Sequence, residues 1–229
     1  MVKAIFFDAG PIITLVMARL DWILAKLKED YDGHFYITPA VKRELIERPM
    51  KIKRFEFEAL QVMKLIKDGV LEVYPNVPTE KINKLKIFAN GAFKIGNKNM
   101  DVVQEGELEA ITVALELGAE AVVIDERTLR LLIEENTAMK KLLEMRFKRK
   151  ISVNNAKIKH FSQQFKNIKI IRSIELVGVA YKLGLLDSYL PKQKDGRKML
   201  VDAVLWATKY NGCAVTNHEI EELKSTLLS

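Results

Sequence analysis

Two aspartates, Asp8 and Asp125, each follow a short apolar run of the kind that forms a buried strand in a parallel sheet. The carboxyl ends of parallel strands lie at one edge of a sheet, where ligands bind, so we expect the two side chains to share that edge. Carboxylates in one pocket repel one another unless a cation compensates, and Mg²⁺ and Mn²⁺ prefer such hard oxygen ligands. These ions promote cleavage of phosphodiester bonds, which is the chemistry that the pattern indicates.

The elements that must position these aspartates alternate between short apolar runs and helical patterns. Strands are predicted at 3–8, 35–37, 70–74, 121–125 and 168–171. Helices are predicted at 11–27, 39–48, 52–67, 79–90, 105–117, after 127–130, and at 176–183, 197–210 and 219–228. The alternation predicts an α/β fold with three layers, α/β/α, around a central parallel sheet. We expect one domain over 1–229, with a basic helical insertion at 136–169 and a C-terminal helical extension at 190–229.

Two glutamates on predicted helices are further candidates. Glu44 lies in a helix that starts at Thr38-Pro39, an N-cap followed by proline. Glu107 lies in the first turn of the helix that opens at Glu105. Each has an ordinary structural explanation, a solvated helix face for Glu44 and the helix dipole for Glu107. Only their combination with the two aspartates gives them weight.

That combination resembles the successive motifs of PIN-domain proteins. The matching segments are Ile5–Ile13, Thr38–Leu45, Gly106–Ile111 and Val123–Arg127. The similarity is to a prokaryotic branch whose first motif reads Asp-x-(Ser/Gly)-Pro-Leu-Ile and whose third reads Gly-Glu-x-(Glu)-Ala-Ile. It covers roughly residues 3–130 and resumes at 170–186. The basic insertion between Val123–Arg127 and the segment at 170–186 is a departure from the branch.

The resemblance implies a metal site in which Asp8 is the first ligand, Glu44 the second, and Glu107 and Asp125 complete the set. PIN domains are typically Mg²⁺- or Mn²⁺-dependent endoribonucleases. Many are toxins of VapBC-type toxin–antitoxin pairs, and others process RNA. The resemblance therefore implies an RNA substrate and, in the toxin role, a small antitoxin protein as partner. A homodimer is common in the family but has no signature in this sequence.

Four residues in or near these motifs need separate interpretation. Glu109 lies about 200° around the helix from Glu107 and should point away from the site. Ser173 falls where this branch often places a hydroxyl near the site, although capping at the end of a strand explains it equally well. Arg127 and Arg130 are candidates for contact with phosphate, with surface ion pairing as the alternative.

A second pair of polar residues could complete the site instead. Asp202, followed by Ala214–Asn217, resembles the third and fourth motifs of other PIN branches. In that alignment the ligands would be Asp8, Glu44, Asp202 and Asn217. The alternative interpretation of this tail is a pair of helices that pack on the domain.

The net charge of +7 is concentrated in one segment. Residues 136–172 contain eleven Lys or Arg and one acidic residue, Glu144, so this segment carries +10 and the rest of the chain about −3. Phenylalanines 147, 161 and 165 and His160 are interleaved with these cations, a mixture suited to single-stranded nucleic acid. The candidate contacts to RNA are Arg146, Lys148, Arg149, Lys150, Lys157 and Lys159. A solvated helical hairpin is the alternative.

Composition excludes several classes of protein. No apolar run is long enough to span a membrane, and the apolar N-terminus is interrupted by Asp8 and lacks a cleavage site, so we expect no secretory signal. The single cysteine, Cys213, cannot form an internal disulfide, and we expect it to be a small buried residue. A reducing cytoplasm is the expected location.

Two other functions are alternatives to the nuclease. Phe6–Gly10 resembles the nucleophile motif of haloacid-dehalogenase-type phosphatases, but Gly10 stands where most of them have a second aspartate. An inactive PIN scaffold that only binds RNA or an antitoxin is the non-enzymatic alternative. The presence of all four acids favours the enzyme.

Overall fold

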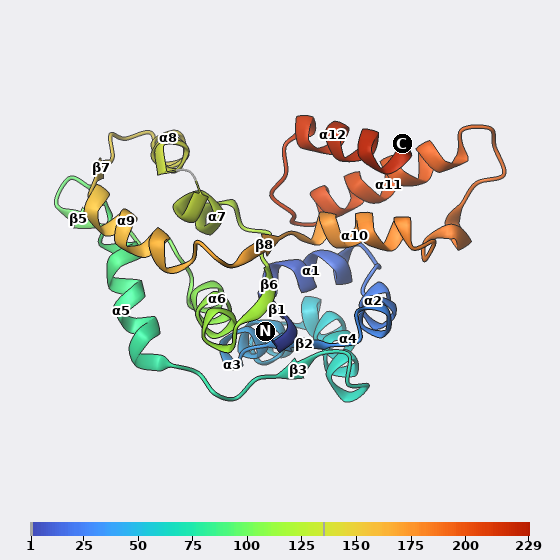
Figure 1. The fold of residues 1–229 in the computed structure, drawn as a ribbon, viewed down its shortest axis with the longest axis horizontal. Coiled ribbons are helices and arrows are strands. Elements are labelled where there is room, and N and C mark those ends of the chain that lie inside the picture. The colour runs from blue at the N-terminus through green and yellow to red at the C-terminus, as the bar shows by residue number, and fades with distance from the viewer. Residues whose placement is uncertain (1, 135) are drawn as a thin grey trace.

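A computed structural model describes residues 2–134 and 136–229 of the chain. At its centre is a five-stranded sheet, all parallel, with the strand order β3-β2-β1-β6-β8 (Figure 1). The strands are β1 (Val2–Phe7), β2 (His34–Ile37), β3 (Glu72–Val73), β6 (Ala119–Val123) and β8 (Lys169–Ile171). Because β1 and β6 are neighbours, with Phe7 paired to Val123, the residues that follow these two strands emerge side by side.

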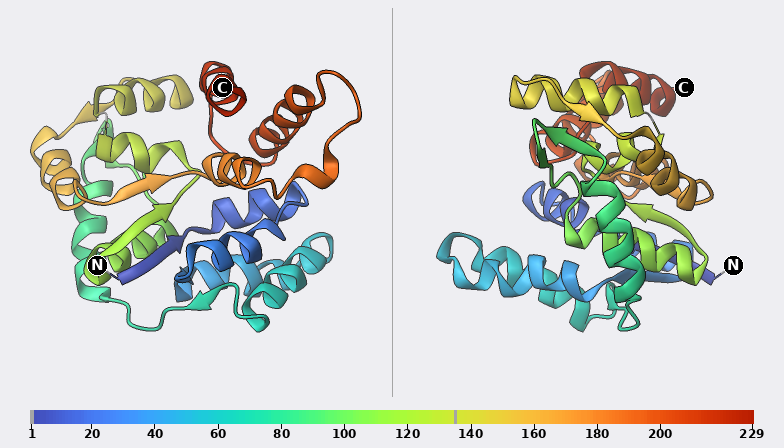
Figure 2. Two further views of the ribbon diagram at one scale, coloured as in Figure 1. Left: turned by 45° about the vertical axis from the view of Figure 1, so that its right-hand side comes forward. Right: turned by 90° about the vertical axis from the view of Figure 1, so that its left-hand side faces the viewer.

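Helices cover both faces of the sheet, which confirms the predicted three-layer arrangement (Figures 1 and 2). One face carries α1 (Ala9–Met17), α2 (Ile23–Tyr31), α4 (Glu56–Lys67), α10 (Ser173–Lys182), α11 (Gly196–Tyr210) and α12 (Asn217–Leu228). The other carries α5 (Thr79–Asn90), α6 (Glu105–Leu117), α7 (Arg127–Glu134), α8 (Asn136–Phe147) and α9 (Asn155–Gln164). The short α3 (Pro39–Lys42) and the helical turns η1 (Arg43–Glu47), η2 (Pro49–Lys51), η3 (Lys53–Phe55) and η4 (Asp187–Tyr189) complete the helical elements.

The central strand β1 shows why the chain folds this way. Phe6 and Phe7 are both fully buried, but Phe6 belongs to the core under α5–α9 and Phe7 to the core on the opposite face. Successive side chains of a strand point to opposite faces, so a continuous apolar run is what a strand covered on both sides requires. The same principle applies to Val122 and Val123 of β6.

The predicted helix at 11–27 is wrong in one respect, because the chain forms two helices there. α1 ends at Met17 and α2 begins at Ile23, with Arg19 between them in a left-handed conformation (φ 59°). Val16 in α1, Leu20 in the connection and Leu24 in α2 are buried in the same core. Their helical spacing therefore continues across the turn, which is why the sequence indicates a single helix.

The basic segment is packed into the domain. It comprises α8, α9 and the short strand β7 (Ser152–Val153), which pairs antiparallel with β4 (Phe93–Ile95), the partner of β5 (Lys98–Asn99). Phe161 and Phe165 are 0 % and 1 % exposed. These two rings are therefore not available to stack on bases. They belong to the core that attaches the segment to the helices beside the sheet, whereas Phe147 is exposed.

The predicted C-terminal helical pair is confirmed as α11 and α12, which pack with α10 (Figure 1). Arg172, just before α10, forms ion pairs with Glu175 at 2.5 Å and with Glu219 of α12 at 2.7 Å. Burial alone would raise the pKa of Glu219, but hydrogen bonds from Thr216 and the Arg172 guanidinium lower it to about 2. The ion pairs thus fasten α12 to the start of α10.

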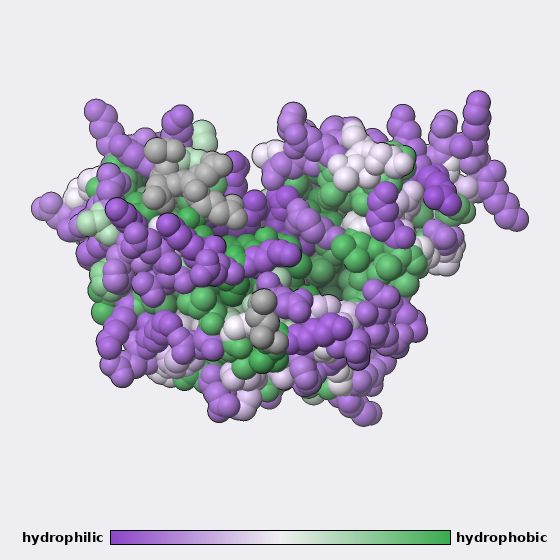
Figure 3. Space-filling model, in the orientation of Figure 1, coloured by the Kyte–Doolittle hydropathy of each residue, from purple (hydrophilic) through white to green (hydrophobic). Residues whose placement is uncertain are grey.

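The outer surface is mostly polar. Hydrophilic side chains cover much of the face in Figure 3, with hydrophobic residues exposed along a band across its middle. Among the residues that the structure describes, no helix combines the length and the apolar character needed to cross a membrane.

Candidate active site

Asp8 lies at the carboxyl end of β1 and caps α1. Its carboxylate accepts a hydrogen bond from the Gly10 amide at 3.2 Å, and its side chain is 5 % exposed. Burial raises the pKa of Asp8 to about 6, against the lowering effect of the backbone amides of residues 9 and 10, and the charges of Glu44 and Asp125 raise it further. Asp8 is thus a buried carboxyl that faces other acids.

Glu107 occupies the first turn of α6 and is 4 % exposed. Its carboxylate accepts a hydrogen bond from the backbone amide of Gln104 at 3.2 Å. Burial, followed by the charge of Asp8, raises the pKa of Glu107 to about 8. The loop before it is held by the side chain of Asn90, whose oxygen accepts from the amides of Val102 and Val103. Asn90 therefore fixes the point from which α6 and Glu107 start.

Glu44 lies in η1, a π-helical turn in which the Arg48 amide bonds back to the carbonyl of Arg43. Such turns frequently occur at functional sites. A Cβ on Gly106 would lie 3.1 Å from Oε1 of Glu44, so the absence of a side chain at 106 leaves room for this carboxylate beside Glu107. Burial raises the pKa of Glu44, and Arg48 opposes the increase.

Asp125 is 2 % exposed and its carboxylate is enclosed by donors. Oδ1 accepts from the backbone amide of Ser173, and Oδ2 accepts from the hydroxyls of Thr14 and Ser173, each at 2.7 Å. Ser173 therefore contacts the site directly, a role that the sequence suggested but could not distinguish from capping at the end of a strand. These bonds fix Asp125 beside Asp8: a Cβ on Gly10 would lie 3.4 Å from Oδ2 of Asp8 and 3.6 Å from Cβ of Asp125.

The C-terminal helices support Asp125 from behind. The backbone amide of Ala214, between α11 and α12, donates to the carbonyl of Asp125 at 3.2 Å. Gly212 (φ 138°) lies so close to Thr14 that a Cβ there would be 2.8 Å from the Thr14 hydroxyl. Cys213, between them, is 3 % exposed, as expected of a small buried residue. The loop of residues 212–214 is thus part of the site's supporting structure.

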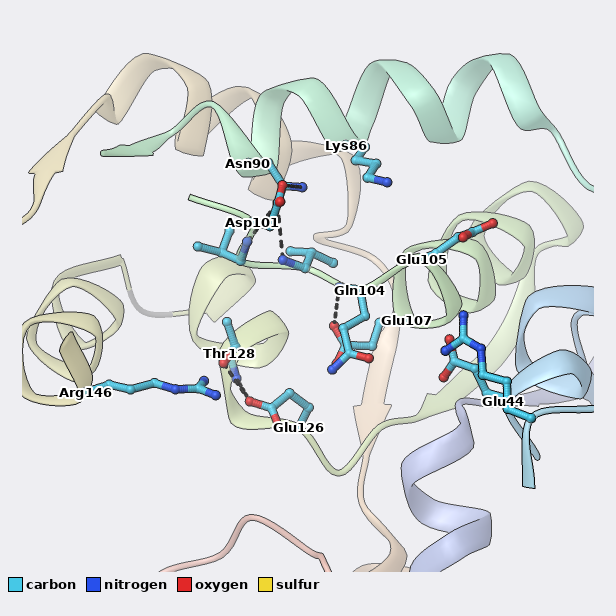
Figure 4. A pocket seen from close by; sticks show the side chains of 13 residues that line it. Glu44, Lys86, Asn90, Asp101, Gln104, Glu105, Glu107, Glu126, Thr128 and Arg146 are labelled. Carbon is cyan, nitrogen blue, oxygen red and sulfur yellow. Dashed lines mark hydrogen bonds between the residues drawn. The ribbon is translucent and has the colours of Figure 1, made fainter. Parts of the chain in front are cut away.

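A cavity of about 430 Å³ opens over this group of acids (Figure 4). Glu44 and Glu107 line it, whereas Asp8 and Asp125, which are both buried, do not. Its other lining side chains include five that the sequence did not single out: Arg48, Lys86, Asn90, Asp101 and Glu126. Glu126 could have been predicted from the sequence, because it directly follows Asp125 at the end of a strand. The others come from distant segments and have no local pattern.

Glu126 is a fifth acid at this edge of the sheet. Its Oε1 accepts from the hydroxyl of Thr128 at 2.6 Å, and its charge helps to raise the pKa of Glu107, after burial and Asp8. Glu126 faces the cavity (Figure 4), whereas the carboxylate of the neighbouring Asp125 accepts from the hydroxyls of Thr14 and Ser173 and does not line the cavity. Either carboxylate could supply the fourth acidic group.

The structure separates the other predicted residues from the acids. Glu109 turns to α3, where it accepts from the Ala40 amide at 2.9 Å, and it does not line the cavity, although its charge helps to raise the pKa of Glu44, after burial. Asp202 pairs with Lys224 of α12, and Asn217 accepts from Lys209. Neither of that alternative pair lines the cavity, and the structure does not bring them to Asp8.

Of the six predicted RNA contacts, Arg146 is the one that lines the cavity (Figure 4). Lys148, Arg149 and Lys150 follow the end of α8 and are exposed, and Nζ of Lys157 lies against Gly91 at the end of α5. Lys159 is exposed on α9. Arg127 and Arg130 line a separate hollow of about 300 Å³ against residues 214–216 and 219.

The acids suit a divalent cation in type and in charge. They offer hard oxygen donors, and the raised pKa values of Asp8 and Glu107 show that the folded chain confines negative charge that a cation would relieve. The space at Gly106 leaves the Glu44 carboxylate free to join them. Over the described ranges 2–134 and 136–229, no three acidic, His or Cys side chains already stand at ligating positions, so binding would require side-chain adjustment.

Comparison with known proteins places this architecture in a family. A family model described as "DUF3368: PIN domain" matches residues 4–138, which include Asp8, Glu44, Glu107 and Asp125. No curated protein and no solved structure matches the chain. PIN domains are typically nucleases and generally use divalent metal ions. The match covers more than half of the chain and agrees with the parallel sheet and its acidic edge, and the chain therefore belongs to the PIN-domain family.

Proposed function

We propose that the protein is a Mg²⁺- or Mn²⁺-dependent endoribonuclease that hydrolyses RNA phosphodiester bonds. The observation that carries the proposal is the pair Asp8 and Glu107. Both are nearly inaccessible, and the charge of Asp8 contributes, after burial, to the raised pKa of Glu107. Unrelieved burial of acids is costly and is typical of sites that hold a metal or carry out chemistry.

In this proposal Asp8, Glu44 and Glu107 hold the cation, with Asp125 or Glu126 as the fourth acid. A bound divalent ion lowers the pKa of a water molecule and neutralises charge on a phosphodiester. The protein's own contribution is to position the carboxylates. Thr14 and Ser173 fix Asp125 by hydrogen bonds, and Gly106, next to Glu107, leaves room for the Glu44 carboxylate.

The test compares RNA cleavage by the wild type and by Asp8→Asn with and without Mn²⁺. Asparagine caps helices as well as aspartate does, so the variant should fold while losing the charge. We expect at least a ~100-fold loss of Mn²⁺-dependent cleavage, of the order seen when a principal electrostatic group is removed. Glu80→Gln, an exposed acid on α5, is the matched control. Equal cleavage by the wild type and Asp8→Asn would refute the proposal.

A toxin-type role and an RNA-processing role differ in their biological consequences. A toxin should arrest growth when expressed alone, and Asp8→Asn should relieve the arrest. A small antitoxin protein should co-purify with the toxin and suppress it. Growth unaffected by the active enzyme would favour RNA processing instead.

A further inference from the structure

Three cations surround the acidic cavity, and they come from three separate parts of the fold. Arg48 follows η1, Lys86 lies on α5, and Arg146 lies on α8. Figure 4 shows Lys86 on the α5 side of the cavity and Arg146 extending from α8 toward Glu126 and Thr128. The acids therefore lie between positive groups on different walls.

The charge of Arg48 already acts on Glu44, whose pKa it lowers, so Lys86 and Arg146 are the cations most available for a ligand. Within the described part of the chain, none of the three forms an ion pair with another side chain, whereas Lys140 of α8 pairs with Glu144 and Arg172 pairs with two glutamates. A polyanion that approaches a group of carboxylates is repelled, and flanking cations offset this repulsion by binding its phosphates.

Arg146 is held at the cavity by the packing of its helix. Met139 and Leu143 of α8 are buried in the core that also contains Leu129 and Leu132 of α7. Immediately beyond the helix, Lys148 adopts a left-handed conformation (φ 51°), and residues 148–150 do not line the cavity. The helix thus directs one arginine of the basic segment inward.

The cavity's size restricts what can enter. About 430 Å³ is a volume typical of sites for small molecules, and residues of η1, α5, α6, α7 and α8 line this open cavity. A strand with unpaired bases can bend into such a site, whereas a base inside a duplex has to be extruded first. The walls therefore favour a single strand.

We infer that Arg146, together with Lys86 and Arg48, binds the phosphates of single-stranded RNA on either side of the bond that is cut. The inference rests on the proposed ribonuclease function and deepens it. It also gives the basic segment, which lies almost entirely beyond the family match at 4–138, a direct part in substrate binding.

The test is a matched pair of substitutions, Arg146→Gln and Arg149→Gln. Both remove one exposed arginine from the same segment, but only Arg146 lines the cavity. The probe is a labelled single-stranded oligoribonucleotide of about 12 nucleotides, titrated in EDTA at several salt concentrations so that binding is measured without cleavage. A hairpin of equal length serves as the duplex comparison.

Arg146→Gln should weaken binding by about fivefold and reduce the salt slope by about 0.7, the value for one phosphate contact with a single strand. Arg149→Gln should change affinity by less than about twofold. With Mn²⁺ present, Arg146→Gln should raise KM and leave kcat nearly unchanged, because the contact binds substrate and transition state equally. The hairpin should bind more weakly than the single strand.

Equal effects of the two substitutions, a hairpin bound as tightly as the single strand, or no binding by the wild type would each overturn the inference. If the wild type cleaves RNA and Arg146 has no influence, the inference fails and the ribonuclease stands. Binding that depends on Arg146, without any Mn²⁺-dependent cleavage, would retain the binding surface and refute the ribonuclease.

Discussion

Replacing Glu107 by glutamine should make the metal-free protein more stable at alkaline pH, although it removes a proposed ligand. Burial raises the pKa of this carboxyl from 4.5 to about 8. The folded state therefore binds the proton more tightly than the unfolded state, so its stability is greatest below pH 4.5 and falls as the pH rises toward 8. At about 1.4 kcal/mol per pH unit, the ionised carboxylate destabilises the fold by up to about 5 kcal/mol. Glutamine keeps an oxygen for the Gln104 amide.

The measurement is thermal unfolding in EDTA, followed by circular dichroism between about pH 5 and about pH 9. If half of the penalty is recovered, Glu107→Gln should raise the Tm at pH 8 by about 5–10 °C, given about 2–4 °C per kcal/mol for a chain of this size. Mn²⁺ should then stabilise the wild type more than the variant. Glu116→Gln, an exposed acid on the same helix, is the control. A variant less stable than the wild type at pH 8 would show that Glu107 is not held at an electrostatic cost.

Three further changes test the support of the site and the C-terminal helices. Gly106→Ala should reduce cleavage about tenfold by displacing the Glu44 carboxylate, whose Oε1 lies 3.1 Å from the new Cβ, while stability measured by urea changes by less than about 1 kcal/mol. Ser173→Ala should cost about 1–3 kcal/mol in the same assay, because Asp125 loses a buried donor; no loss would contradict the hydrogen bond at 2.7 Å. Glu219→Gln should flatten the fall in stability from pH 4.5 toward 2, since the folded pKa of this acid, about 2, is lowered; an unchanged acid limb would refute that contribution.

The sheet and the position of Asp8 could be predicted because their signals are local. An apolar run ending in Asp8 and followed by Gly10-Pro11 specifies a buried strand, a turn and a helix start without reference to the rest of the chain. Thr38-Pro39 specifies the start of α3 in the same way. Glu44, five residues further, could be placed on the correct helical segment, but not in a π-helical turn.

The rest of the site depends on contacts between distant segments. The sequence could not show that Asp125 is bound by Thr14 and Ser173, or that Glu126 rather than Asp125 lines the cavity. The basic segment was interpreted from composition, which does not distinguish a core phenylalanine from an exposed one. Packing alone separates Phe161, which is buried, from Arg146, which reaches the cavity.

The loop between α11 and α12 has a consequence for the order in which the protein is made. The ribosome produces the acids of the sheet edge first, and the Ala214 amide that bonds to the Asp125 carbonyl comes much later. At roughly 5–20 residues per second, the stretch between Asp125 and that loop takes several seconds to synthesise. During this interval the nascent chain carries its carboxylates without their rear support. A protein assembled in this order would gain the rear support of its acidic site only after residues 212–214 have emerged from the ribosome.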